Sequence, residues 1–238
     1  MVADAVKKPQ YPTVVVLIPA FNEENAVGNV IRDIPKELIS EIVVINNNSN
    51  DATSENALKA GATVLDEPKQ GYGNACLKGI NYIHSIKTPT DIVVFIDADY
   101  SDYPEEIAAL VKPITDEGFD LVIGSRTLGK REKGAMTPQQ IFGNWLATRL
   151  LKLFYGVKYT DLGPFRAIKY EKLLEMNMRD KTYGWTVEMQ LKAAKQKLKI
   201  CEVPVNYRKR IGFSKISGTV KGTVMAGYKI ITTIFKYL

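Results

Sequence analysis

Asp97 and Asp99 directly follow DIVVFI, an apolar run that predicts a buried strand. Two carboxylates one residue apart at the end of a strand can reach the same ligand. Such hard oxygen ligands suit Mg²⁺ or Mn²⁺, which usually keep bound waters and bridge to substrate phosphates. A metal held there would neutralise a departing nucleoside diphosphate. The alternative is capping of the next helix by Asp99 or Ser101, but the acidic residues Glu23 and Asp51 favour a metal site.

Apolar runs and amphipathic segments alternate through the first half of the chain. The predicted strands are 14–18, 41–45, 62–65, 91–96 and 121–124. Their continuous apolar character is typical of parallel strands that helices bury on both faces. The sequence therefore predicts an α/β fold with right-handed crossovers. Further helices are expected at 141–155 and 186–197.

Ligands of parallel sheets bind outside the carboxyl ends of the strands. The residues predicted at that edge are Pro19, Ala20, Asn22, Glu23, Asn46, Asn47, Asn48, Ser49, Asp51, Asp97 and Asp99. They should converge on one site whose polar groups are mostly hydrogen-bond acceptors. The chain lacks GxxxxGK(S/T), and no GxGxxG follows the first strand, which disfavours a P-loop kinase and a dinucleotide site.

The composition excludes several other chemistries. One histidine, His84, cannot form a multi-histidine zinc site. Two cysteines, Cys76 and Cys201, cannot form a disulfide framework and favour a reducing compartment. No run of about 18 apolar residues occurs, so no membrane span is predicted. The N-terminus lacks the basic-then-apolar order of a signal peptide, so none is expected.

The formal net charge of +6 conceals a strong asymmetry. Residues 1–125 contain 9 basic and 19 acidic residues, a net charge of −10, whereas residues 126–238 contain 23 and 7, a net charge of +16. An uneven solvated surface is the plain alternative. We expect the acidic half to hold a metal and a nucleotide, and the basic half to meet an anionic partner.

Four segments in this order resemble the inverting glycosyltransferases of family 2: VVVLIPAFNEEN, EIVVINNNSNDAT, GYGNACLKGI and DIVVFIDADYSDYPE. The resemblance covers about residues 12–215 and is greatest to the polyprenyl-phosphate sugar synthases, of the dolichyl-phosphate mannose or glucose synthase type. It implies the GT-A fold, a Rossmann-like, mostly parallel sheet flanked by helices. It also implies a catalytic domain (12–217) with a nucleotide-sugar half (12–125) and an acceptor half (126–217). An N-terminal tail (1–11) then precedes this domain, and the segment 218–238 follows it as a predicted C-terminal amphipathic helix.

The resemblance also implies roles for particular residues. Asp97 and Asp99 would hold the metal, with Asp99 the more direct ligand, and Arg126 would stand near an acceptor phosphate. The nucleotide-sugar contacts would be Pro19, Ala20, Asn22, Glu23, Asn47, Asp51, Lys69, Gly71, Asp97 and Ala98.

The chain departs from the family pattern at two places. The family usually has aspartates where Asn46 and Asn47 stand, so negative charge is missing near the base site and the donor base stays open. A glutamine is common two residues after the second metal aspartate, where this chain has Ser101. Water or Asp102 would then complete the metal shell.

The basic half supplies candidates for binding an acceptor phosphate: Arg126, Arg166, Arg208, Arg210 and Lys215. A phosphate monoester has a second pKa of about 6, so it is largely ionised at neutral pH and can itself act as the nucleophile. A hydroxyl acceptor would instead need a general base, for which Glu188 is the candidate. An acid early in a helix is also simply favourable for the helix dipole.

The last segment, 218–238, places apolar residues on one helical stripe, which Lys221, Lys229 and Lys236 interrupt. The stripe consists of Val220, Val224, Tyr228, Ile231, Phe235 and Leu238. This pattern favours a helix at a membrane interface or against a partner membrane subunit; packing within the domain is the alternative.

These observations favour a metal-dependent inverting enzyme that uses Mg²⁺ or Mn²⁺. It would move a hexose from a nucleoside-diphosphate sugar, of the GDP-mannose or UDP-glucose type, to a polyprenyl or dolichyl phosphate. It would act as a peripheral protein on the cytoplasmic face of a membrane. A saccharide hydroxyl is the alternative acceptor, and homo-oligomerisation stays open. A polyanion-binding module is weaker, and no nucleic-acid partner is expected, because aromatic residues do not interleave with the basic run.

Overall fold

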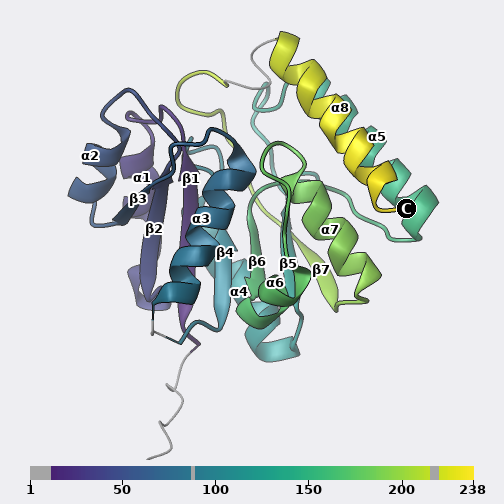
Figure 1. Ribbon diagram of the computed structural model, residues 1–238, viewed down its shortest axis with the longest axis horizontal. Helices are drawn as coiled ribbons and strands as arrows, with labels where there is room; N and C mark the ends of the chain where they lie inside the picture. Colours follow the sequence, from purple (N-terminus) through teal and green to yellow (C-terminus); the bar gives the residue numbers. More distant parts are fainter. Residues whose placement is uncertain (1–11, 87–88, 215–219) are drawn as a thin grey trace, which may run out of the picture.

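The computed structural model describes residues 12–86, 89–214 and 220–238, which form a sheet with helices on both faces (Figure 1). The strands are β1 (Val14–Ala20), β2 (Glu41–Asn46), β3 (Thr63–Asp66), β4 (Ile92–Phe95), β5 (Leu121–Ser125), β6 (Arg166–Lys169) and β7 (Ile200–Pro204). The helices are α1 (Val27–Asp33), α2 (Thr53–Lys59), α3 (Tyr72–Ser85), α4 (Ile107–Glu117), α5 (Pro138–Tyr155), α6 (Tyr170–Met176), α7 (Trp185–Lys195) and α8 (Val220–Lys236). Short 3₁₀ turns cover Lys36–Leu38 and Pro104–Glu106.

The seven strands are ordered β3-β2-β1-β4-β6-β5-β7. All pairs are parallel except those of β6, which runs antiparallel between β4 and β5. The five strands predicted from the sequence are therefore confirmed, as is the mostly parallel α/β sheet. Pro19 does not end β1, which continues to Ala20. Both β6 and β7, with α6 between them, were missed because their short runs carry charged residues.

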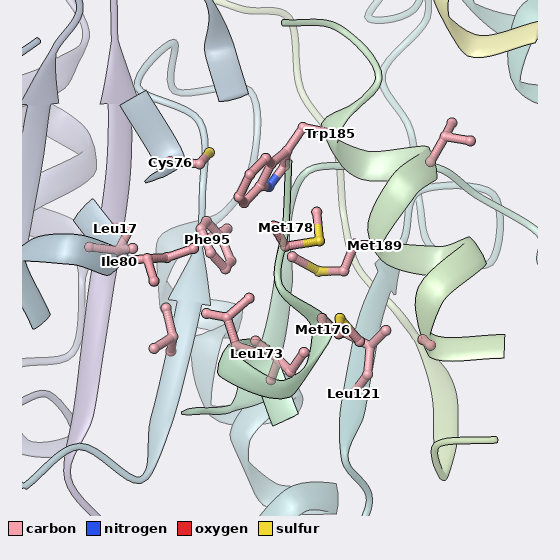
Figure 2. Packing of buried hydrophobic residues seen from close by; sticks show 14 of the residues in the cluster. Leu17, Cys76, Ile80, Phe95, Leu121, Leu173, Met176, Met178, Trp185 and Met189 are labelled. Carbon is pink, nitrogen blue, oxygen red and sulfur yellow. The ribbon is translucent and has the colours of Figure 1, made fainter. Parts of the chain in front are cut away.

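Successive side chains of each strand point to opposite faces of the sheet, so a hydrophobic core forms on each side of it. Val14, Val16 and Ile18 pack against α1 and α4, whereas Val15 and Leu17 point to the opposite side, toward α3. Figure 2 shows this second core, in which Leu17, Phe95 and Trp185 lie near the methionines of the α6–α7 region. The Phe95 and Trp185 ring centroids are 6.1 Å apart. This packing fixes the end of β4, where the paired aspartates begin.

Helices α5 and α8 lie side by side at one end of the molecule (Figure 1). Ile234 is buried, the Tyr155 hydroxyl donates to the Ile234 carbonyl over 2.6 Å, and the Phe154 and Phe235 rings meet edge to face. Both helices also leave apolar side chains exposed, among them Trp145 and Tyr228. Across the described ranges, no helix combines the length and apolarity that a membrane span requires.

Candidate active site

The loops after β1, β2 and β4 meet the start of α3 around a cavity of about 340 Å³. This confirms that the carboxyl ends of the strands converge on one site. The lining residues are Pro19, Ala20, Phe21, Glu23, Asn47, Gln70, Gly71, Tyr72, Ala75, Asp97, Ala98, Asp99, Tyr183, Arg210 and Ser214. Most of the predicted donor-site residues are thus present, but Phe21, Tyr72, Ala75 and Tyr183 were not predicted for it.

Asn47 organises the β2 side of the cavity. Its Nδ2 donates to the carbonyls of Glu67 and Lys69, over 3.1 and 2.8 Å, and its Oδ1 accepts from the Gly71 amide at 2.7 Å. One amide side chain therefore holds the loop that leads into α3. A carboxylate at position 47 could accept the bond from Gly71 but could not donate to the two carbonyls.

Three predicted donor contacts lie beside the cavity rather than in its described lining. Asn22 adopts a left-handed conformation (φ 53°), and its Oδ1 accepts from the Asn50 amide at 2.8 Å. Asp51 accepts from the amides of Thr53 and Glu24. Lys69 contributes its carbonyl to Asn47. These residues shape the loops after β1 and β2.

Glycines allow the start of α3 to touch the segment 180–182. Gly71 has φ 137°, and a Cβ placed there would lie 2.2 Å from the Lys181 carbonyl oxygen. A Cβ at Gly73 would lie 2.0 Å from the Asp180 carbonyl oxygen. The Asn74 amide donates to the Lys181 carbonyl over 3.0 Å. Only glycine fits such an approach of two backbones.

Three carboxylates gather at the end of β4. Asp99 and Asp102 are buried and Asp97 is half-buried, and Asp97 Oδ1 and both Asp102 oxygens are buried without a hydrogen-bond partner. Burial, together with the charge of Asp99, raises the pKa of Asp97 to about 7. Burial and the charge of Asp97 also hold the pKa of Asp102 well above its usual range.

Unpaired buried carboxylate oxygens are costly unless a cation binds them. These carboxylate oxygens are therefore suited to binding Mg²⁺ or Mn²⁺. Among the residues that the structure describes, no three Asp, Glu, His or Cys side chains form an enclosed metal cage. Mg²⁺ is commonly held by one or two carboxylates and completed by substrate phosphates and water. Asp97 and Asp99 would hold it.

Arg210 is the one cation in the described lining. Its Nη2 lies 2.6 Å from Glu23 Oε1, and its Nη1 lies 3.0 Å from Asp99 Oδ2. The other oxygen of Asp99 accepts from the amide and hydroxyl of Ser101, at 2.9 and 2.5 Å. Arg210 therefore joins the loop after β1 to the loop after β4.

Arg208 has a different role from the phosphate contact predicted for it. Its guanidinium lies 3.4 Å from the Tyr100 ring centroid and 4.2 Å from that of Tyr103. It donates to the Tyr100 carbonyl over 2.8 Å. The Arg208 amide donates to the Ser101 carbonyl and the Ile211 amide to that of Asp99. Arg208 thus fastens the 208–211 segment that carries Arg210 over the aspartates.

Two predicted acceptor cations are already used inside the protein. Arg166, a predicted acceptor contact, is 0% exposed and donates to the carbonyls of Leu162, Gly163 and Thr186. Burial lowers the Arg166 pKa to about 10. Arg126 forms a bidentate pair with Asp161, over 2.6 and 2.8 Å, and lies against the Tyr207 ring outside the described lining. Lys215 falls outside the described residues.

Glu188, the predicted general base, does not lie in the described lining of this cavity. The side chain is 1% exposed, and its oxygens accept from the amides of Arg179 and Asp180 and from the Tyr237 hydroxyl. Lys192 pairs with the same carboxylate at 2.7 Å. Its position early in α7 gave a misleading signal, because the carboxylate serves to join α7 to α8.

Comparison with known proteins identifies the family of this chain. Residues 15–176 match the family model described as glycosyl transferase family 2. The chain belongs to this family. The enzyme class predicted from the sequence is therefore confirmed.

Two relatives of this glycosyltransferase align along most of their length. The dolichyl-phosphate hexose transferase of Haloferax volcanii is 30% identical over 215 residues, which cover 88% of this chain and 89% of the relative. The UDP-N-acetylglucosamine–dolichyl-phosphate N-acetylglucosaminyltransferase of Methanococcus voltae is 28% identical over 237 residues, with 90% and 91% coverage.

A solved structure confirms the GT-A fold of this family 2 member. Glucosyl-3-phosphoglycerate synthase from Mycobacterium tuberculosis, in complex with Mn²⁺, UDP-glucose and phosphoglyceric acid, superposes with a TM-score of 0.75. The two chains are 24% identical, and the alignment covers 95% of this chain and 79% of the other. At that identity the likeness concerns the fold.

Proposed function

We propose that this family 2 glycosyltransferase moves a hexose from a nucleoside-diphosphate sugar to a polyprenyl phosphate, with Mg²⁺ or Mn²⁺ bound. The observation that carries this proposal is the cavity in which Asp97 and Asp99 face Arg210. A carboxylate pair for the metal and a cation for phosphate then share one space. The names of two relatives, both dolichyl-phosphate transferases, support a lipid phosphate as acceptor.

The donor would lie across the edge formed by β1, β2 and β4. Pro19, Ala20 and Glu23 would border the nucleoside, while Gly71 leaves room beside the start of α3. Asp97 and Asp99 would hold the metal, which supplies charge neutralisation to the leaving diphosphate. The GDP or UDP form of the donor stays a proposal, as does the identity of the hexose.

The hydrogen bonds and ion pairs of the carboxylates support an acceptor that needs no general base. Glu23 and Asp99 are paired with Arg210, and Glu188 lies elsewhere. This arrangement favours an acceptor that is already ionised, because a phosphate needs alignment and charge screening more than it needs a base. Arg210 would turn from its carboxylates to the acceptor phosphate and hold it in line with the anomeric carbon. A saccharide hydroxyl remains the competing acceptor.

We also propose that the outer side of α5 and α8 contacts the cytoplasmic face of a membrane. Phe142 and Trp145 of α5 are 60% and 52% exposed, and Tyr228 of α8 is 65% exposed. Arg149 lies 5.8 Å from the Trp145 ring centroid, so a cation accompanies these apolar groups. Aromatic and basic residues together are typical of interfacial helices. The alternative is that the segment 218–238, described from residue 220 onward, contacts a partner membrane subunit. The predicted boundary at 217 between catalytic domain and helix lies outside the described residues.

The test is a transfer assay with purified protein, Mn²⁺ or Mg²⁺, a panel of labelled nucleotide sugars, and either polyprenyl phosphate or free saccharides. We expect label in the organic extract only when the lipid and one donor are both present. Label that appears only on free saccharides would overturn the lipid acceptor while retaining the enzyme class.

A further inference from the structure

A second cavity, of about 360 Å³, lies between the segment 179–182 and the last turns of α8. Its lining includes four cationic side chains, Arg179, Lys181, Lys229 and Lys236, and two acidic ones, Asp180 and Glu188, a net charge of +2. None of these residues was assigned to the donor cavity. The question is which ligand such a lining can bind.

Both acids are already satisfied by the protein. Glu188 accepts from two backbone amides and from the Tyr237 hydroxyl, and it pairs with Lys192. Asp180 Oδ1 accepts from the amides of Thr182 and Gly184, at 2.8 and 3.1 Å, while its Oδ2 lies 3.0 Å from Lys229 Nζ. These carboxylates have little capacity left for a metal ion.

Most of the cationic side chains in the lining have no acidic partner among the described residues. Within the described ranges, Arg179, Lys181 and Lys236 form no ion pair, whereas Lys229 is bound to Asp180. The hydroxyl of Thr232 also lies in the lining. Guanidinium, ammonium and hydroxyl donors around one concave space are the groups that bind phosphate oxygens. We infer that this cavity is a second anion site, which binds a phosphate group at the α8 side of the protein.

The site has a direct structural path to the donor cavity. The carbonyls of Lys181 and Thr182 accept from the amides of Asn74 and Gly73, at the start of α3. Tyr183 follows in the chain and lines the donor cavity. An anion that orders 179–182 therefore also fixes the backbone behind Gly71, and donor affinity should rise with occupancy. This coupling rests on the proposed function, whereas the anion site itself does not.

The phosphate could come from a phospholipid headgroup or from a soluble phosphate. The lipid source is reasonable because the exposed apolar side of α8 lies on the same helix as Lys229 and Lys236. Both sources share the chemistry of a singly or doubly charged phosphate. The experiment must therefore measure phosphate binding first and its source second.

Inorganic phosphate is titrated into the full chain by calorimetry, in EDTA and without donor. The double variant Arg179→Gln/Lys236→Gln is compared with Arg210→Gln, which changes the donor cavity, and with Lys59→Gln, which removes one positive charge on α2. We expect at least about tenfold weaker binding in the double variant, with an affinity close to wild type retained in Lys59→Gln and a second-cavity component retained in Arg210→Gln. Equal phosphate affinity in the wild type and the double variant would overturn the site, whatever the transfer assay shows.

Two further measurements test where the bound phosphate comes from and whether its binding raises donor affinity. Vesicles of phosphatidylcholine with and without phosphatidylglycerol are sedimented with each protein. If a lipid supplies the phosphate, the double variant should lose its preference for the anionic vesicles. An unchanged preference assigns the site to soluble phosphate.

Donor affinity is then measured with and without phosphate. A rise in the wild type that is absent in the double variant supports the coupling, and no rise in the wild type contradicts it while leaving the binding result intact.

Discussion

Arg210 lies with its Nη1 3.0 Å from Asp99 Oδ2, in the position where a cation neutralises the proposed metal ligand. Glu23 accepts from the same guanidinium at 2.6 Å. A divalent metal bound as proposed would have to compete with this guanidinium for Asp99. Arg210 is also the cation that we propose for the acceptor phosphate, so metal binding would favour its release from Asp99.

Replacing Arg210 should have opposite effects on metal binding and on transfer. In Arg210→Gln, Mn²⁺ alone should bind about tenfold more tightly, because Asp99 loses its competing partner. Transfer to lipid phosphate should fall roughly 10²-fold, because a charged contact to the transition state is lost. Free Mn²⁺ is measured by electron paramagnetic resonance. Arg32→Gln, the same substitution at an exposed position of α1, should leave both values unchanged; weaker Mn²⁺ binding in Arg210→Gln would contradict the competition.

Asp99 and Asp102 should differ in what their loss removes. Asp99→Asn should abolish detectable transfer and weaken Mn²⁺ binding, because it removes the proposed direct ligand. Asp102→Asn should raise the free energy of unfolding by about 1–3 kcal/mol in metal-free protein, because an unpartnered buried carboxylate is lost. Denaturant titrations in EDTA provide the comparison. Full activity in Asp99→Asn would refute the metal assignment.

Glu188→Gln should loosen α8 without removing chemistry. The substitution weakens the bonds from Tyr237 and Lys192, at a cost of about 1–3 kcal/mol in unfolding free energy. Turnover with saturating donor and lipid phosphate should change less than about threefold, since no base is required. Tyr237→Phe should reproduce part of the stability loss. A 10²-fold loss of turnover in Glu188→Gln, with normal stability, would restore Glu188 as a base.

The stability conferred by Glu188 should depend on pH. Burial alone would raise its pKa, but the hydrogen bonds from Lys192, Tyr237 and the 179–180 amides outweigh burial and hold the pKa below its ordinary value. A carboxylate with a lowered pKa in the folded state contributes stability above its unfolded pKa of about 4.3, and this is lost as pH falls through the folded value. The difference in unfolding free energy between wild type and Glu188→Gln should therefore shrink as pH falls below about 4.3. A constant difference from neutral to acidic pH would contradict this.

Gly73 should tolerate no side chain. A Cβ would lie 2.0 Å from the Asp180 carbonyl oxygen, so Gly73→Ala must displace α3 or the 180–182 segment. We expect a stability loss of about 2 kcal/mol or more and weaker donor binding. Gly143→Ala is the control, because nothing lies within 4 Å of its Cβ in α5 and alanine favours a helix by about 1 kcal/mol. Similar thermal melts for the two variants would refute the close contact.

The proposed membrane surface predicts a selective loss of vesicle binding. Trp145→Ser combined with Tyr228→Ser should reduce sedimentation with anionic vesicles by roughly tenfold or more, because about 1–3 kcal/mol of burial per side chain is lost. Donor affinity should not change. Leu58→Ser on α2 removes another exposed apolar residue, 59% exposed, and should have no effect. Unchanged sedimentation of the double variant would assign this surface to another partner.

The sequence predicted the sheet better than it predicted the cations. Five strands had long apolar runs, and the polar residues after three of them could be placed at one edge because parallel strands share a direction. The residue types alone could not predict which partners these charged side chains have. Arg166 donates to buried carbonyls, Arg126 pairs with Asp161, and Glu188 lies in another cavity. Asp161 lies 35 residues from Arg126 and Tyr237 lies 49 residues from Glu188, whereas Arg166 meets nearby carbonyls that only the folded turn at 162–163 presents to it. Tyr183 illustrates the same limit, since its place in the donor cavity follows from glycines some 110 residues earlier.

The antiparallel strand β6 has a consequence for how the chain acquires its structure. β5 pairs with β6 and β7, which come from residues 166–169 and 200–204, while β4 gains its second neighbour only through β6. During synthesis, a nascent chain that ends near residue 125 exposes an unpaired edge of β4 and leaves β5 without a neighbour. Such open edges invite pairing with other chains. The first half of the sequence carries most of the donor-site chemistry, yet its sheet is completed only after the ribosome has added the second half.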